Sequence, residues 1–142
     1  MKASERGSAV LQLVIMAPVL LSFTLLCIAG GRLWLANQAV DAAAFDAART
    51  ASIARNAQAA ASGARSTAQS SLTNRQIRCS RTEVSLDTSG FSLPVGTPAT
   101  VQVTLACTVN LEDVTLPGMP STLTIRKSAS SSLDTFRERT DR

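Results

Sequence analysis

The stretch that decides the fold is RGSAVLQLVIMAPVLLSFTLLCIAGG, residues 6–31. After Arg6 no charged residue occurs until Arg32, so residues 8–31 are uncharged throughout. An apolar helix of about 20 residues spans the roughly 30 Å hydrocarbon core of a lipid bilayer. The few polar residues inside the stretch carry no charge. The sequence therefore predicts a transmembrane helix over residues 8–31, preceded by a short charged leader, residues 1–7.

A cleavable secretory signal peptide is the alternative interpretation of this segment. Lys2 and Arg6 would form its basic region, and Cys27-Ile28-Ala29 would provide small residues for cleavage before Gly30. However, the apolar run is longer than the roughly 7–15 residues typical of a signal peptide. It also continues into another helical pattern without a turn signal. A membrane anchor is therefore favoured.

Residues 32–75 are rich in alanine, the strongest helix former. Small residues recur there in steps of three and four, the period of one helix face, and the pattern continues to Leu72. The first members of this alanine stripe are Ala36, Val40, Ala43, Ala47, Ala51 and Ala54. The pattern predicts one long helix from the membrane to about Leu72, kinked at Pro18, where the ring clashes with the preceding turn. Because small residues let helix backbones approach closely, the stripe predicts packing against other helices.

From about residue 80 the hydrophobic period changes to two, which indicates β-strands. Val84 and Leu86 alternate in a first candidate strand, and a shorter third candidate contains Leu123 and Ile125. The longest run alternates through Val101, Val103, Leu105, Cys107 and Val109. Turn residues separate the three runs. The sequence thus predicts a small antiparallel sheet of about three strands in residues 76–133, covered by the C-terminal part of the long helix. With a flexible charged tail, residues 134–142, the expected class is α+β.

The cysteines divide into one inside the apolar run, Cys27, and two in the polar part, Cys79 and Cys107. The spacing of the latter pair fits no zinc motif. We expect a Cys79–Cys107 disulfide formed in an oxidising compartment; two free thiols in a cytosolic domain are the alternative. The disulfide favours a cytoplasmic N-terminus and an extracytoplasmic C-terminal domain.

Charge and composition exclude several function classes. The net charge is +4, and residues 32–81 hold seven Arg against two Asp, which gives +5. This basic stem could touch anionic headgroups, or it is a solvated helix face. No basic run is interleaved with aromatic residues, so nucleic-acid binding is not expected. The chain has no histidine, the usual general base and metal ligand. We therefore predict no enzymatic activity, no metal or cofactor and no small-molecule substrate.

The boundary Arg6-Gly7-Ser8 before an uncharged helix resembles the processing site of type IV prepilins. More closely, residues 5–55 resemble the TadE-like family of Tad (Flp) pilus assembly. The shared features are the Arg-Gly-Ser boundary, Pro18, Gly31-Arg32, Gln38-Ala39-Val40 and Asp46-Ala47-Ala48-Arg49. The resemblance implies a pilin-like fold and cleavage between Gly7 and Ser8 by a membrane-embedded prepilin peptidase.

The resemblance departs from the pilin pattern at Gln12, the fifth residue counted from Ser8. Pilins usually carry Glu there, thought to pair with the N-terminal amine of a neighbouring subunit. A glutamine is neutral and can only hydrogen-bond. This difference points to a minor pilin-like assembly factor rather than to the major subunit of a fibre.

Two functions from different classes follow. The first is a membrane-anchored pseudopilin of a Tad-type pilus or related secretion apparatus, in the bacterial cytoplasmic membrane. Its expected partners are other pilin-like subunits, the pilus assembly platform and the prepilin peptidase, and the alanine stripe would pack against those subunits. The second is a single-pass or secreted envelope protein whose β domain binds a ligand or the cell wall. The two differ in the expected N-terminus, which is Ser8 in the first and Met1 or a residue near Gly30 in the second.

Overall fold

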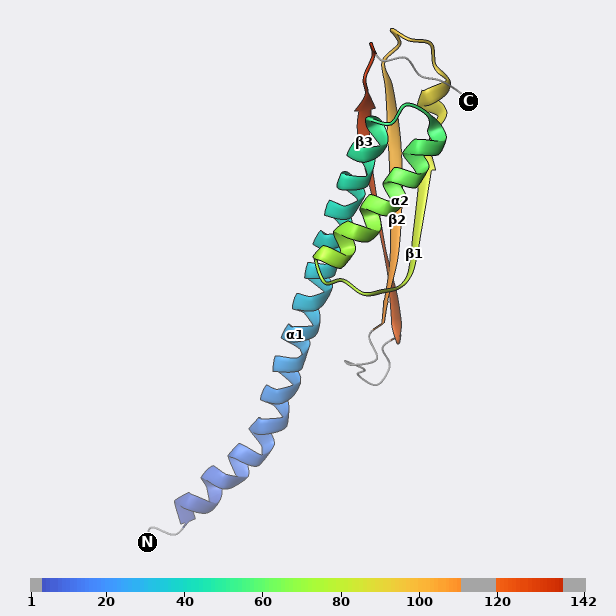
Figure 1. Cartoon of the computed structure of the whole chain (residues 1–142). Helices are drawn as coiled ribbons and strands as arrows, with labels where there is room; N and C mark the ends of the chain where they lie inside the picture. Colours follow the sequence, from blue (N-terminus) through green and yellow to red (C-terminus); the bar gives the residue numbers. More distant parts are fainter. Residues whose placement is uncertain (1–3, 111–119, 137–142) are drawn as a thin grey trace. The chain divides into compact units, whose positions relative to one another are not determined.

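The structure, a computed structural model, describes residues 4–110 and 120–136, with side chains from Val10 onward. Along the chain it contains helices α1 (Ser4–Ser52) and α2 (Ala57–Asn74), strand β1 (Cys79–Asp87), the 3-10 helix η1 (Ser89–Ser92), and strands β2 (Ala99–Asn110) and β3 (Thr122–Leu133) (Figure 1). The predicted α+β class with a three-stranded antiparallel sheet is confirmed. Parts of the predicted leader and of the predicted tail, and residues 111–119 between β2 and β3, lie outside the described residues.

The chain divides into two compact units, Met1–Trp34 and Leu35–Arg142. In the first unit, the large apolar side chains of α1 from Val10 to Ile28 are exposed. The hydroxyl groups there bond within the helix: Ser22 Oγ donates to the Pro18 carbonyl at 2.7 Å, and Thr24 Oγ1 donates to the Leu20 carbonyl at 2.8 Å. Such internal bonds satisfy hydroxyls that lipid could not. α1 continues through Pro18, and the kink at this residue stays a prediction.

The prediction of one helix reaching Leu72 is wrong, because α1 ends at Ser52 and α2 begins at Ala57. The N-cap of the second helix is Asn56, whose side-chain Oδ1 accepts the Ala59 N–H at 2.7 Å. Asparagine is among the best residues at this capping position, since its side chain satisfies an unpaired backbone donor. The first helix ends where Ser52 Oγ donates to the Arg49 carbonyl, at 2.8 Å.

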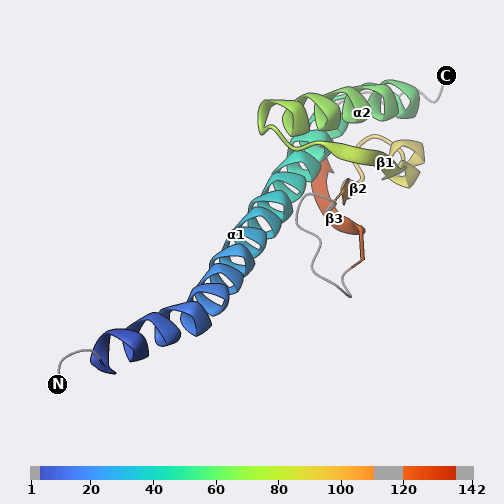
Figure 2. The same ribbon diagram turned by 90° about the horizontal axis from the view of Figure 1, so that it is seen from below.

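Within the second unit, α2 folds back along the C-terminal part of α1 (Figures 1 and 2). Thr67 Oγ1 donates to Thr50 Oγ1 at 3.1 Å, and Ser71 Oγ donates to Asp46 Oδ2 at 2.8 Å. Because the residue number rises along α2 as it falls along α1, the two helices run antiparallel. Gly63 lies where they meet, since a Cβ atom there would be 3.2 Å from Thr50 Cγ2.

The sheet has the order β1-β2-β3, with both pairs antiparallel. The predicted inner face of β2 is confirmed: Val101, Val103, Leu105 and Cys107 are fully buried. From β3 the buried residues are Ile125, Ala129 and Leu133. This third strand is longer than the sequence predicted and pairs with β2 along its whole length, from Ala99 opposite Leu133 to Asn110 opposite Thr122.

The alanine stripe of α1 lies inside this core. Its members Ala36, Val40, Ala43, Ala47 and Ala51 are buried, while Ala54 is half-buried in the turn between the helices. From α2 the buried residues are Ala60, Ala64, Ala68 and Leu72. The expectation that this stripe packs against other subunits is thereby corrected, because the chain's own fold already covers these side chains. The stripe is covered because the helix is interrupted after Ser52, which lets α2 return along α1.

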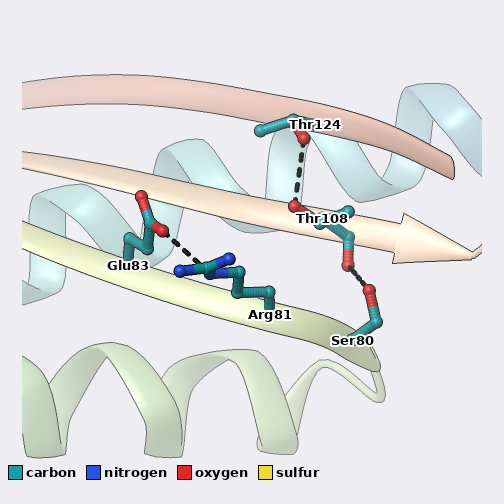
Figure 3. Close-up of polar contacts among 5 residues, drawn as sticks. All are labelled: Ser80, Arg81, Glu83, Thr108 and Thr124. Carbon is teal, nitrogen blue, oxygen red and sulfur yellow. Dashed lines mark hydrogen bonds and ion pairs between the residues drawn. The ribbon is translucent and has the colours of Figure 1, made fainter.

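The end of the sheet that holds the disulfide also carries polar contacts (Figure 3). The pairing of β1 with β2 shifts between Cys79 and Arg81, which leaves Ser80 as an extra residue in a β-bulge. Ser80 Oγ donates to the Thr108 carbonyl at 2.9 Å, and the Thr108 and Thr124 hydroxyls lie 3.0 Å apart. Arg81 Nε lies 2.9 Å from Glu83 Oε1, but both side chains are mostly exposed. This ion pair therefore contributes little to stability.

Asp87 closes the turn from β1 into η1. The Ser89 backbone N–H donates to Asp87 Oδ1 at 3.0 Å, and this hydrogen bond, with one from the Ser89 side chain, lowers the pKa of Asp87. A carboxyl group whose pKa is lowered by folding stabilises the fold above its ordinary pKa, and that contribution is lost as the pH falls through the folded-state pKa.

We therefore expect Asp87→Asn to be slightly less stable than the unsubstituted chain at neutral pH, because the neutral amide accepts a weaker hydrogen bond. Below the folded-state pKa both side chains are uncharged, so the difference should shrink as the pH falls through that pKa. Thermal unfolding of the full-length chains in detergent micelles, followed by circular dichroism from pH 7 to pH 2, measures this. A difference that persists unchanged at low pH would contradict the assignment.

Candidate membrane anchor and assembly surface

The first candidate site is the apolar part of α1. Among the described residues, one helix is long and apolar enough to cross a membrane, by length and composition. Its most apolar window has a mean hydropathy of 2.4 and is not buried within the protein. The core helix of a soluble protein would instead be largely covered. This exposure makes the helix a candidate membrane span near the N-terminus.

The residues predicted for processing lie at the start of this helix. Gly7 and Ser8 both fall within α1, and their side chains lie outside the described set. Gln12 follows Ser8 by four positions, about one helical turn, and is exposed. The structure thus places the cleavage boundary and the fifth residue on one helix. Cleavage itself stays a prediction.

The structure brings the two predicted cysteines together across β1 and β2. Cys79 and Cys107 form a disulfide with a Cα–Cα distance of 5.4 Å, so the predicted pairing is present. Cys107 is fully buried on the inner face of the sheet. Cys27, in the apolar part of α1, is a free and exposed cysteine.

The sequence analysis missed a second surface, the outer face of α1 in the second unit. We define this outer face as Leu35, Gln38, Asp41, Phe45, Asp46 and Arg49, continued by Ile53 directly after the helix. Its large apolar side chains are well exposed: Leu35 by 59%, Phe45 by 57% and Ile53 by 63%. A helix of a monomeric domain normally presents mainly polar residues on its exposed side. A recognisable signal was the position of Phe45, which lies off the alanine stripe.

The outer face of the sheet is of a different kind. Its hydroxyl side chains pair across the strands, with Thr104 Oγ1 and Ser128 Oγ 3.1 Å apart and Thr108 Oγ1 and Thr124 Oγ1 3.0 Å apart. Cross-strand pairs of this type stabilise a sheet. This polar face is typical of the solvated side of an antiparallel sheet.

Together these features define a class of protein. The described residues form one candidate membrane helix near the N-terminus and an α+β domain, in which a disulfide joins two strands and one helix face carries exposed apolar residues.

The comparison with known families adds a more specific finding. Residues 7–49 match the family model described as TadE-like protein, which confirms the predicted resemblance. The matched segment begins at Gly7 and ends at Arg49, so it contains the uncharged stretch, residues 8–31, and much of the outer face. The match suggests a component associated with the Tad pilus, and the candidate span fits a membrane-anchored TadE-like protein. No curated protein and no solved structure matches the chain.

Proposed function

We propose that this protein is a pseudopilin, a pilin-like structural component of a Tad-type pilus or related secretion apparatus. The observation that carries the proposal is the uncharged stretch of α1 that follows the Arg6-Gly7 boundary, within the segment matching the TadE-like family. The partners proposed are other pilin-like subunits, the assembly platform and a prepilin peptidase. The role is structural, not enzymatic, and acts through packing of α1 against helices of other subunits.

The proposal includes an orientation in the bacterial cytoplasmic membrane. The short leader with Lys2 and Arg6 lies on the cytoplasmic side, where the prepilin peptidase acts, and the α+β domain lies outside. The Cys79–Cys107 disulfide supports this orientation, because disulfides form and persist in oxidising compartments. Gln12 supports a minor component, since a neutral side chain cannot form the ion pair attributed to Glu in pilins.

The second candidate function is a single-pass or secreted envelope protein with a ligand-binding β domain. The hydroxyl-rich outer face of the sheet favours it, because such a surface offers several hydrogen-bonding groups in one plane. The state of the N-terminus separates the two candidates.

Intact-mass and N-terminal peptide mass spectrometry of the full-length protein, purified without reductant from its native membranes, tests the proposal. We expect a chain that begins at Ser8 and is two hydrogens lighter than the reduced form. A chain that begins at Met1 would support the single-pass envelope protein. A chain that begins near Gly30 would support a secreted domain.

The glycine before the cleavage point provides a sharper prediction. We expect Gly7→Leu to retain Met1, because the bulky side chain would stand where the resemblance implies that the peptidase needs glycine. The matched control is Gly30→Ala in the same helix, where an added Cβ meets no atom within 4 Å. This control should still begin at Ser8. Equal processing of Gly7→Leu and of the unsubstituted chain would contradict the assigned boundary.

A further inference from the structure

We propose that the groove between α1 and α2 in the second unit binds an acidic glycan, a chain of sugars that carries oxyanion groups beside its hydroxyls. The groove lies where α2 runs along the C-terminal part of α1 (Figure 2). Its volume is about 520 Å³, within the roughly 300–1,000 Å³ of small-ligand sites. The inference goes beyond the proposed function, and it applies equally to a pseudopilin and to an envelope protein of another kind.

Two arginines supply positive charge to the groove. Arg49 lies in the last turn of α1, and Arg75 directly follows α2. Both residues are exposed, and neither side chain makes an ion pair or a hydrogen bond within the part of the chain that the structure describes. A guanidinium presents its N–H donors in a planar fork that matches the geometry of an oxyanion. The groove therefore offers two unused sites for a negatively charged group.

A row of small polar side chains on α2 lies along the same groove. Ser66, Ser70 and Asn74 recur at intervals of four, so they share one side of the helix over about 12 Å. All three residues are exposed, and among the described residues their side chains form no hydrogen bond. Each offers both donor and acceptor atoms. A single small anion would leave most of this row unused, whereas a chain of sugars can bind along its length.

Hydrogen bonds between the helices hold the groove in place. Thr67 Oγ1 donates to Thr50 Oγ1 at 3.1 Å, and Ser71 Oγ donates to Asp46 Oδ2 at 2.8 Å. A site that is ordered before binding lowers the entropic cost of binding. The second carboxylate oxygen of Asp46 can accept a hydrogen bond from a sugar hydroxyl. Two arginines and one aspartate give the groove a formal charge of 2 − 1 = +1, which favours an anion.

The composition of the groove disfavours lipid chains and apolar peptides as ligands. All the residues that line it are polar, so it offers no hydrophobic side chain to an acyl chain or to an apolar side chain of a peptide. Pockets for apolar ligands are lined mainly by hydrophobic and aromatic residues. The remainder of α2 does not repel an acidic polymer, because Ala57–Asn74 contains no acidic residue. A hydroxyl-rich anion is the ligand that this combination fits.

Nuclear magnetic resonance of the full-length protein, in micelles of a neutral polyoxyethylene detergent, tests the proposal. The arginines are isotope-labelled, and the protein is titrated with tetragalacturonate, an oligosaccharide with one carboxylate on each sugar. We expect the guanidinium Nε–H signals of Arg49 and Arg75 to shift. Those of Arg65 and Arg78, exposed arginines outside the groove, should stay in place. Maltotetraose, a neutral oligosaccharide of the same length, should shift none of the four signals.

Substitution of the arginines tests the role of their charge. Arg49→Gln/Arg75→Gln should weaken binding of tetragalacturonate by at least about tenfold, which corresponds to about 1.4 kcal/mol. The matched control is Arg65→Gln/Arg78→Gln, which removes the same charge from the chain. The control should change the affinity by less than about twofold, because salt screens exposed charges that lie beyond roughly 10 Å.

The serine row is tested by removal of its hydroxyl groups. Ser66→Ala/Ser70→Ala should weaken binding of tetragalacturonate about fivefold, or about 1 kcal/mol. Ser62→Ala is the matched control on the same helix, because Ser62 lies outside the groove and its hydroxyl bonds to the Ala59 carbonyl at 3.1 Å. This control should bind as the unsubstituted chain does.

Two further probes separate a glycan from other anions. Tetraglutamate is an acidic peptide without hydroxyls, and glycerophosphoglycerol is the headgroup of an anionic lipid. Both should bind at least about tenfold more weakly than tetragalacturonate, because neither can use the full row of polar side chains. Equal affinity for either probe would overturn the assignment of a glycan. Equal shifts at Arg65 and Arg78, or unchanged affinity in Arg49→Gln/Arg75→Gln, would overturn the site itself.

Discussion

Removal of the disulfide by Cys79→Ala/Cys107→Ala should lower the free energy of unfolding of the α+β domain by about 3–4 kcal/mol. The bond joins residues separated by 28 positions and links the first two strands of the sheet. It restricts the unfolded chain over that loop, which raises the free energy of the unfolded state. Replacement of both cysteines also avoids leaving a buried, unpaired thiol at Cys107.

Denaturant unfolding of the full-length chain in detergent micelles, followed by circular dichroism, measures this loss. Cys27→Ala is the matched control, because it removes the exposed free cysteine of α1 and leaves the disulfide intact. The control should unfold at the same denaturant concentration as the unsubstituted chain. A loss of less than about 1 kcal/mol in the double variant would contradict a stabilising role for the bond.

Gly90→Ala should destabilise the same domain by about 3 kcal/mol. Gly90 is buried in η1, between the start of β2 and the end of β3. An added Cβ would lie 2.6 Å from the Thr100 carbonyl oxygen and 2.8 Å from Leu133 Cδ1. Thr100 lies in β2 opposite Ser132 of β3, so its backbone cannot move aside without disturbing strand pairing, and the strain must spread through the backbone.

Gly63→Ala provides the comparison for this prediction, again by denaturant unfolding in micelles. A Cβ at Gly63 would approach Thr50 Cγ2 at 3.2 Å, a milder contact with a side-chain methyl group. Alanine in place of glycine within a helix gains about 1 kcal/mol, which offsets that contact. The Gly63 variant should therefore stay within about 1 kcal/mol of the unsubstituted chain. Similar losses in both variants would show that close packing around Gly90 is not the cause.

The parts of this fold that depend on local pattern were predictable. The uncharged stretch 8–31 predicts a spanning helix because length and composition are sufficient for that inference. The alternation from Val101 to Cys107 predicts the buried face of β2, since one side of a half-buried strand must be apolar. The cysteine pair was predictable because its spacing fits no zinc motif and because a disulfide suits a domain in an oxidising compartment.

The parts that depend on tertiary contacts were not predictable in the same way. The interruption of the helix at residues 53–56 is difficult to predict, because alanine-rich sequence continues on both sides of it. Its local signal is Asn56, the N-cap of α2. A stripe of small residues predicts that another element covers it, but it does not say which element. The sequence analysis therefore assigned the alanine stripe to other subunits, whereas the chain's own fold covers it. The C-terminal half of β3 is rich in serine and has few apolar residues, and its length follows from pairing with β2.

The folding back of α2 along α1 covers the small-residue face of α1 within the single chain. That face is therefore not left for another molecule, and the single chain already holds its closest helix packing. If the chain is the pseudopilin proposed above, assembly would join domains that are already folded and would require neither of them to refold.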